Sequence, residues 1–181
     1  GELLESYSGR TDGQGRLVPV GSIAFGPKGD RVFVGRTNGF VGVLDLETGE
    51  FNPFRPHEGT VSQMSFSRDG TRLVSVGTDR VPKLWDIDAR REQHAFPGHT
   101  GTVYGLALSP DGQRMASAGF DGIRIWDVNS GEQVKMLQGH LNGARAVAFS
   151  PDGDSLASAG VDSVLILWDA ESGDELRRLQ G

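Results

Sequence analysis

The chain has 181 residues, a formal net charge of −6 and no cysteine. This length is sufficient for one ordinary hydrophobic core, and the lack of cysteine excludes disulfides and thiolate metal sites. The acidic balance argues against a nucleic-acid surface, which normally carries clustered positive charge. No apolar run approaches the roughly 20 residues of a membrane helix, and the N-terminal GELLESYSGR lacks the apolar segment of a signal peptide. We therefore expect a soluble, cytoplasmic protein that binds neither membrane nor nucleic acid.

The beginning of the chain repeats a segment found later. GELLESYSGR aligns without a gap with GEQVKMLQGH at residues 131–140. Residues 1–15 are therefore predicted to contain the last strand of a preceding repeat unit, followed by an inserted loop.

Four repeat units follow, at residues 16–56, 57–97, 98–138 and 139–181. In the last three units a turn of the Ser-Pro-Asp-Gly type and a Trp-Asp pair recur at spacings of 41 to 42 residues. The first unit is degenerate, because Arg16 stands where the later units have His and Leu44 replaces the Trp of Trp-Asp.

Each unit is predicted to form four strands, which in the third unit fall at residues 103–109, 114–119, 123–128 and 132–137. Ser109-Pro110-Asp111-Gly112 between the first two strands favours a type I turn that ends on a left-handed glycine. The small residues of the second strand suit a strand that neighbours cover on both faces. In the second unit, Pro82 falls inside a predicted strand and removes one ladder donor. No helical period is present, so the pattern indicates an all-β fold.

A set of four polar residues recurs at fixed spacing in the last three units. The step from His to Ser is 18 residues and the step from Ser to Asp is 4 in every copy, whereas the step from Asp to Trp is 6, 5 and 6. The members of these polar quartets are His57, Ser75, Asp79 and Trp85; His99, Ser117, Asp121 and Trp126; and His140, Ser158, Asp162 and Trp168.

Repetition at about 40 to 45 residues with Gly-His and Trp-Asp markers is typical of propeller blades, and over nearly its whole length the chain resembles the WD-repeat β-propeller family. The resemblance implies four four-stranded antiparallel blades plus a surplus N-terminal strand. It also implies that each quartet is a buried hydrogen-bond network. Because the fourth unit has its own last strand and rings of this family commonly have seven blades, we expect an open arc, an interior or truncated segment of a larger propeller. Its open edges invite self-association.

The resemblance further implies a top face near the channel that contacts protein or peptide partners. Three positions in each blade commonly supply these contacts, two around the start of the first strand and one directly before the Asp of the quartet. They correspond here to Thr60, Ser62, Thr78, Thr102, Tyr104, Phe120, Gly143, Arg145 and Val161, with Pro19, Gly21 and Thr37 in the degenerate unit. Tyr104, Phe120 and Arg145 are residue types enriched in binding hot spots. The alternative is that Phe120 packs against the next blade and Tyr104 only lines the channel.

The leading functional prediction is a non-catalytic protein-interaction scaffold without cofactor or metal. The alternative is an enzymatic or small-ligand-binding propeller with its site in the central channel, and a nucleic-acid-binding propeller ranks third. A hydrolase triad of Ser117, His99 and Asp121 is disfavoured, because the set occurs three times and no G-x-S-x-G elbow accompanies it. The glycine-rich turns likewise lack phosphate-loop and calcium-loop spacing.

Overall fold

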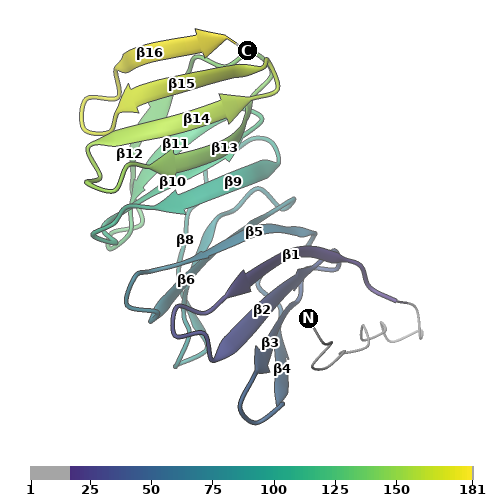
Figure 1. Cartoon of the computed structure of the whole chain (residues 1–181). Helices are drawn as coiled ribbons and strands as arrows, with labels where there is room; N and C mark the ends of the chain where they lie inside the picture. Colours follow the sequence, from purple (N-terminus) through teal and green to yellow (C-terminus); the bar gives the residue numbers. More distant parts are fainter. Residues whose placement is uncertain (1–16, 181) are drawn as a thin grey trace, which may run out of the picture.

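The computed structural model describes residues 17–180, and all regular structure in this range is β. Sixteen strands form four separate four-stranded sheets that follow one another along the chain (Figure 1). We call these sheets blades 1 to 4 in chain order. The strand predicted within residues 1–15 lies outside the described residues, as does Arg16. No helix in the described part of the chain is long and apolar enough to cross a membrane.

The strands have the following bounds. Blade 1 contains β1 (Val20–Phe25), β2 (Arg31–Arg36), β3 (Val41–Asp45) and β4 (Phe51–Phe54). Blade 2 contains β5 (Val61–Phe66), β6 (Arg72–Gly77), β7 (Lys83–Asp86) and β8 (Arg91–Ala95). Blade 3 contains β9 (Val103–Leu108), β10 (Arg114–Gly119), β11 (Gly122–Asp127) and β12 (Gln133–Leu137). Blade 4 contains β13 (Ala144–Phe149), β14 (Ser155–Gly160), β15 (Val164–Asp169) and β16 (Glu175–Gln180).

Within each blade the strands pair in chain order and every neighbouring pair is antiparallel. The first strands β5 and β9 contact each other, as do β9 and β13, so the first strands line one side of the arc. The predicted all-β, open arrangement of four blades is therefore confirmed. Pro82 lies just before β7 rather than inside it, because β7 begins at Lys83.

The turn between the first two strands of each later blade ends on a left-handed glycine, as predicted. In blade 3 the Gly112 N–H donates to the Ser109 carbonyl at 2.8 Å, and Gly112 has φ +69°. The Ser109 hydroxyl donates to the Asp111 carboxylate at 2.5 Å. The corresponding bond from Ser67, together with the Thr71 backbone N–H, lowers the pKa of Asp69 to about 2.

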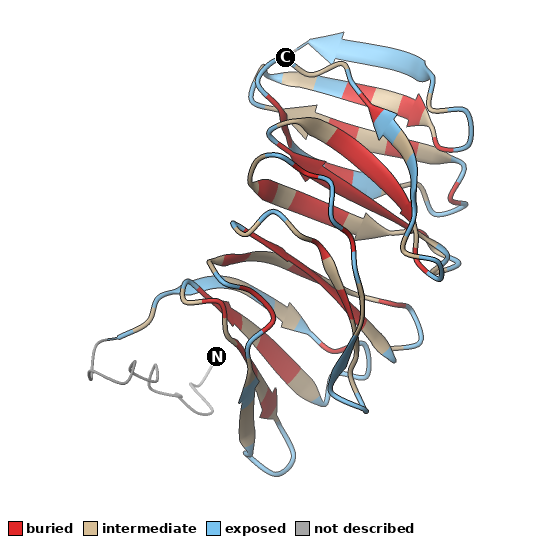
Figure 2. Cartoon of the chain, turned by 180° about the vertical axis from the view of Figure 1, so that it is seen from behind, coloured by how far each residue is buried: buried red, intermediate tan, exposed pale blue. Residues whose placement is uncertain are grey.

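The hydrophobic cores lie between blades rather than within them. One core joins Ala116, Ala118 and Ile123 of blade 3 to Leu156 and Trp168 of blade 4. Similar cores join blade 2 to blade 3 and blade 1 to blade 2. In contrast, every residue of the C-terminal strand β16 is exposed, and this strand is pale blue in Figure 2.

Polar contacts also hold neighbouring blades in register. From blade 3 the Arg114 guanidinium donates to the carbonyls of Gly153, at 2.9 Å, and Ala170, at 3.1 Å, both in blade 4. It also lies 5.7 Å from the centroid of the Phe149 ring. Between blades 2 and 3, the Leu106 N–H donates to the Gln63 side chain at 2.9 Å. The blades therefore present their turns as one fixed surface.

Candidate functional site

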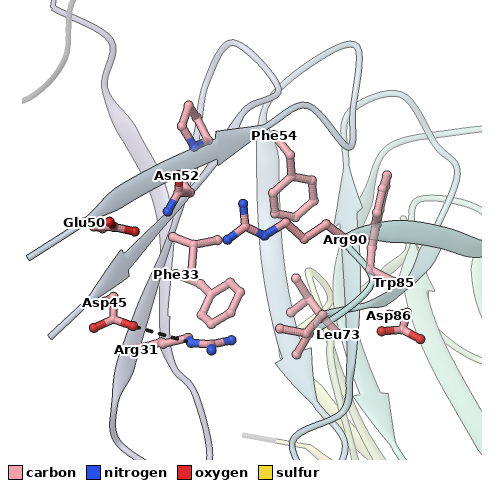
Figure 3. Close-up of a pocket in the computed structure, with 13 residues that line it drawn as sticks. Arg31, Phe33, Asp45, Glu50, Asn52, Phe54, Leu73, Trp85, Asp86 and Arg90 are labelled. Carbon is pink, nitrogen blue, oxygen red and sulfur yellow. Dashed lines mark ion pairs between the residues drawn. The ribbon is translucent and has the colours of Figure 1, made fainter. Parts of the chain in front are cut away.

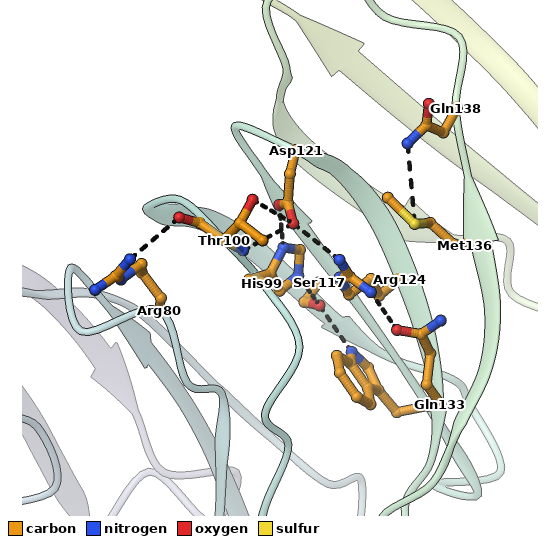
Figure 4. Close-up of polar contacts among 10 residues, drawn as sticks. Arg80, His99, Thr100, Ser117, Asp121, Arg124, Gln133, Met136 and Gln138 are labelled. Atoms are coloured by element: carbon orange, nitrogen blue, oxygen red, sulfur yellow. Dashed lines mark hydrogen bonds and ion pairs between the residues drawn. The ribbon is translucent and has the colours of Figure 1, made fainter.

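The quartet of blade 3 forms a continuous buried chain of hydrogen bonds (Figure 4). His99 Nδ1 lies 2.5 Å from Asp121 Oδ1, and His99 Nε2 lies 2.7 Å from the Ser117 hydroxyl oxygen. The Trp126 Nε1–H donates to the same oxygen at 2.8 Å. The strands supply these partners in register, since Ser117 in β10 is two residues from Met115, the direct partner of Trp126.

The direction of each hydrogen bond follows from which groups can donate a proton and which can only accept one. An ionised Asp121 can only accept, so His99 Nδ1 carries the proton and Nε2 accepts from the Ser117 hydroxyl. Ser117 in turn accepts from the Trp126 indole. Burial lowers the pKa of His99, although the Asp121 carboxylate opposes this shift. The lowered pKa favours a neutral imidazole, and the hydrogen bonds to Asp121 and Ser117 fix its tautomer.

Asp121 also holds the loop that enters the blade. Burial raises its pKa, but the bonds from His99, from the Thr100 backbone N–H and from Arg124 outweigh this and hold the pKa well below its usual range. The Thr100 N–H lies 2.9 Å from Asp121 Oδ2. The Glu58 N–H in blade 2, at 3.2 Å, and the Leu141 N–H in blade 4, at 2.7 Å, make the same bond to the equivalent aspartates.

The other two quartets differ at the tryptophan. In blade 4, His140, Ser158, Asp162 and Trp168 reproduce the chain, with the indole donating to Ser158 at 2.8 Å. In blade 2, His57 bonds Asp79 at 2.9 Å and Ser75 at 2.8 Å. The Trp85 Nε1, however, is buried and has no hydrogen-bond partner. The prediction that Trp85 completes its quartet is therefore wrong.

Packing against blade 1 accounts for this difference. Trp85 is only half-buried, whereas Trp126 and Trp168 are 1% and 3% exposed. The centroid of its ring lies 5.1 Å from the centroid of the Phe54 ring. The Trp85 ring also lines a cavity of about 100 Å³ between blades 1 and 2 (Figure 3). Because the neighbouring blade leaves space along the ring, packing does not hold the indole against Ser75.

Sequence reasoning missed two further roles. Arg124, which is buried, donates to Asp121 at 2.9 Å and also bonds Gln133, so it extends the quartet of blade 3 into β12. The Asp of each Trp-Asp pair accepts backbone N–H groups of the following turn. The Asp127 carboxylate, for example, accepts from Asn129 at 2.9 Å and from Ser130 at 2.7 Å, and the Ser130 bond is the main cause of its lowered pKa.

The structure also brings together the positions assigned to the top face. In every blade the residue before the quartet Asp, or its counterpart in blade 1, donates its N–H to the carbonyl of the residue that precedes the first strand. These pairs are Thr37 with Pro19, Thr78 with Thr60, Phe120 with Thr102, and Val161 with Gly143, at 3.1 to 3.3 Å. Ser62 is half-buried on β5, and Gly21 is exposed on β1. We use the term top face for the end of the arc that carries these pairs.

Tyr104, Arg145 and Phe120 lie on adjacent blades of this top face. The Arg145 guanidinium of β13 lies 3.8 Å from the centroid of the Tyr104 ring of β9. Phe120 is 61% exposed, and a Cβ at Gly143 of the next blade would meet its backbone at 2.7 Å. The main chain of Phe120 therefore packs closely against the next blade, while its ring is exposed to solvent.

The chemical capacity of the quartets is limited by their burial. The side chains of His57 and His99 have no exposed surface and that of His140 is 2% exposed, so substrate cannot reach Ser117 or its equivalents. Among residues 17–180, no group of three or more His, Asp or Glu side chains is placed to hold a metal ion. The quartets serve to hold turns, strands and loops together.

Comparisons with known proteins give a consistent result. The family model for the WD domain, G-beta repeat, matches residues 50–86, 90–127 and 131–169. A eukaryotic translation initiation factor 3 subunit I from Culex quinquefasciatus is 34% identical over 80 residues, which are 44% of this chain and 24% of that protein. A WD repeat-containing protein 1 from Gallus gallus is 43% identical over 74 residues, which are 39% of this chain and 12% of that protein.

A WD repeat-containing protein 1 from Mus musculus is 29% identical over 82 residues, which are 43% of this chain and 14% of that protein. The chain thus spans a quarter or less of the length of these relatives. Each matched repeat ends at a Trp-Asp pair whose aspartate caps the following turn, and three such repeats account for more than half of the chain. The chain therefore belongs to the WD-repeat family, whose members are generally non-catalytic scaffolds for protein interaction.

Proposed function

We propose that this chain is a non-catalytic scaffold that binds a protein or peptide partner on its top face, with the contact centred on Tyr104, Phe120 and Arg145. The observation that supports the proposal is the stacked pair of Tyr104 and Arg145, beside an exposed Phe120. The pair joins two blades that Arg114 and an apolar core already hold in register.

These three residues have the chemistry of a binding hot spot. Tyrosine and arginine contribute large contact area and directed hydrogen bonds, and both are enriched in hot spots. The stacked ring orders the Arg145 side chain before binding, so little conformational freedom is lost when a partner docks. The remaining top-face positions, such as Thr60, Thr78, Thr102 and Val161, are small and would form the rim.

The enzymatic alternative has less support. It requires convergent ionisable groups in the channel, and among the top-face positions only Arg145 carries a charge. The cavity beside Trp85 is lined by blades 1 and 2 and includes none of these positions.

The test is selection of binding peptides from a random displayed library on the immobilised chain, followed by affinity measurement on purified variants. We expect Arg145→Ala and Tyr104→Ala each to weaken binding of the selected peptides by at least about tenfold, in the range of a hot-spot residue. Arg177→Ala on the exposed strand β16 is the matched control and should bind as the unmodified chain does. Peptides that bind all three variants equally would refute the proposal.

A further inference from the structure

The cavity beside Trp85 lies at the end of the blades opposite the top face. Its lining includes Arg31, where β2 begins, and Arg90, directly before β8. The top face is at the other end of β2, where Thr37 follows the strand. Both walls of the cavity belong to four-stranded sheets within the described residues, so blades 1 and 2 form it without any further blade. It is therefore a candidate site separate from the top face.

The cavity exists because an aromatic pair is packed less tightly here than in the next interface. Phe54 and Phe96 hold equivalent positions, each three residues before the histidine of a quartet. Phe96 is fully buried against Trp126, whereas Phe54 and Trp85 are both half-buried. The buried Phe33 ring adds to the apolar lining. The volume of about 100 Å³ is less than that of a cavity of roughly 150 Å³ that binds benzene, so the cavity can hold one apolar side chain.

Arg90 lies over this cavity in a strained backbone conformation. Its φ is +51°, in the left-handed region, whereas the corresponding residue of each other blade is glycine. A residue with a Cβ is disfavoured in this region, and such strain concentrates at functional sites. The Arg90 side chain reaches across the cavity between the rings of Phe54 and Phe33 (Figure 3). Within residues 17–180 its guanidinium makes no hydrogen bond or ion pair, so it is available to a ligand.

The other charges of the cavity limit what this ligand can be. The carboxylates of Asp45, Glu50 and Asp86 also line the cavity, and among the described residues none of them pairs with Arg90. Asp45 and Asp86 accept backbone N–H groups of the turns that follow them, at 2.8 to 3.0 Å. Three carboxylates near one free guanidinium disfavour a small free anion. An anionic group that is joined to an apolar anchor overcomes this repulsion, because burial of the anchor supplies binding energy.

We propose that the cavity holds one apolar side chain of a partner peptide, and that Arg90 binds the side-chain carboxylate of an Asp or Glu next to it in that peptide. The planar guanidinium matches a carboxylate with two parallel hydrogen bonds. Asn52 faces the cavity from β4, and its side chain makes no hydrogen bond within the described part of the chain (Figure 3). An asparagine amide can both donate to and accept from a peptide group, which favours a peptide over a small apolar acid.

The experiment selects short random peptides from a displayed library on a chain that carries both Tyr104→Ala and Arg145→Ala. These substitutions remove the centre of the top-face contact, so the outcome does not depend on the function proposed above. We expect the selected peptides to share an apolar residue next to Asp or Glu. On binding, a selected peptide should shift the nuclear magnetic resonance signal of the Trp85 indole N–H, which is assigned by its loss in Trp85→Phe. The indole signals of Trp126 and Trp168, buried at other interfaces, should not move.

Arg90→Gln should weaken binding of the selected peptide by at least about tenfold, as expected for a lost hydrogen bond between charged groups. Arg91→Gln is the matched control, because Arg91 is the next residue, is exposed on β8 and lies outside the cavity lining. Changing the acidic residue of the peptide to its amide should cost as much as Arg90→Gln, and the two changes together should cost no more than either alone. Circular dichroism should show that both variants keep their β structure.

Three results would each overturn the proposal. One is a selection that enriches no peptides of this kind. Another is a selected peptide that binds the Arg90→Gln and Arg91→Gln variants equally well. The third is binding that leaves the Trp85 indole signal unchanged, because the apolar side chain would then lie outside the cavity.

Discussion

Replacing single tryptophans by phenylalanine in two quartets separates the contribution of the indole N–H from that of ring packing. Trp126→Phe removes a buried donor that bonds the Ser117 hydroxyl at 2.8 Å. Trp85→Phe removes a buried donor that has no partner. Both changes keep an aromatic ring, next to Phe96 in one case and Phe54 in the other.

The two substitutions should differ in their effect on the free energy of unfolding. Losing the Trp126 bond should cost about 1 kcal/mol, in addition to the packing lost with the smaller ring. Removing the unpaired Trp85 N–H relieves a desolvation penalty of about 1–3 kcal/mol, which offsets its packing loss. We therefore expect Trp126→Phe to destabilise the protein by about 2–4 kcal/mol more than Trp85→Phe.

Urea unfolding followed by far-ultraviolet circular dichroism measures this difference without depending on tryptophan emission. Trp168→Phe should behave like Trp126→Phe, because its indole donates to Ser158 at the same distance. Equal losses for Trp85→Phe and Trp126→Phe would show that packing alone, and not the indole hydrogen bond, determines the cost.

Three further substitutions test other parts of the structure. Asp121→Asn should lower the unfolding free energy at pH 7 by about 2 kcal/mol, because charged hydrogen bonds are replaced by neutral ones. Since the folded-state pKa of Asp121 is lowered, the carboxylate stabilises the fold above its unfolded pKa of about 3.9, and this contribution is lost as the pH falls below that value. The unfolding midpoint should therefore fall less steeply between pH 7 and pH 2 in the variant than in the unmodified protein. Parallel profiles for the two proteins would contradict the assignment. Arg90→Gly should stabilise the protein by about 0.5–1 kcal/mol, because Arg90 has φ +51° where the other blades have Gly49, Gly131 and Gly173. A lower thermal midpoint for the variant would mean that the Arg90 side chain stabilises the fold by more than its backbone strain costs. Arg114→Ala should destabilise the protein by about 2 kcal/mol, because two hydrogen bonds between blades 3 and 4 are lost. Arg177→Ala serves as the exposed control. Equal unfolding midpoints for the two variants would refute the linking role of Arg114.

The quartets illustrate how far the sequence alone determines the site. The steps of 18 and 4 residues place His, Ser and Asp together in three blades, because the strand and turn lengths between them do not vary. The step to Trp is the same for Trp85 and Trp168, yet only Trp168 bonds its serine. The difference arises from the packing of the preceding blade, which a spacing pattern within one unit does not contain.

Contacts between blades were predictable in position but not in detail. Tyr104 and Arg145 are 41 residues apart, one repeat, so they fall side by side on neighbouring blades. Arg124 gave no such signal, because the quartets of blades 2 and 4 have Lys83 and Ile166 at its position. Its burial depends on Asp121 and Gln133, which are brought to it only by the folded sheet.

Because the apolar cores lie between sheets, no single blade contains a complete core of its own. Stability in such a chain is a sum of nearest-neighbour couplings, as in other linear arrays of repeats. Among residues 17–180, blades 2 and 3 have a neighbour on each side, whereas blades 1 and 4 have one each. Amide hydrogens of β14 and β15 should consequently exchange faster than those of β10 and β11, so that the array frays inward from its ends.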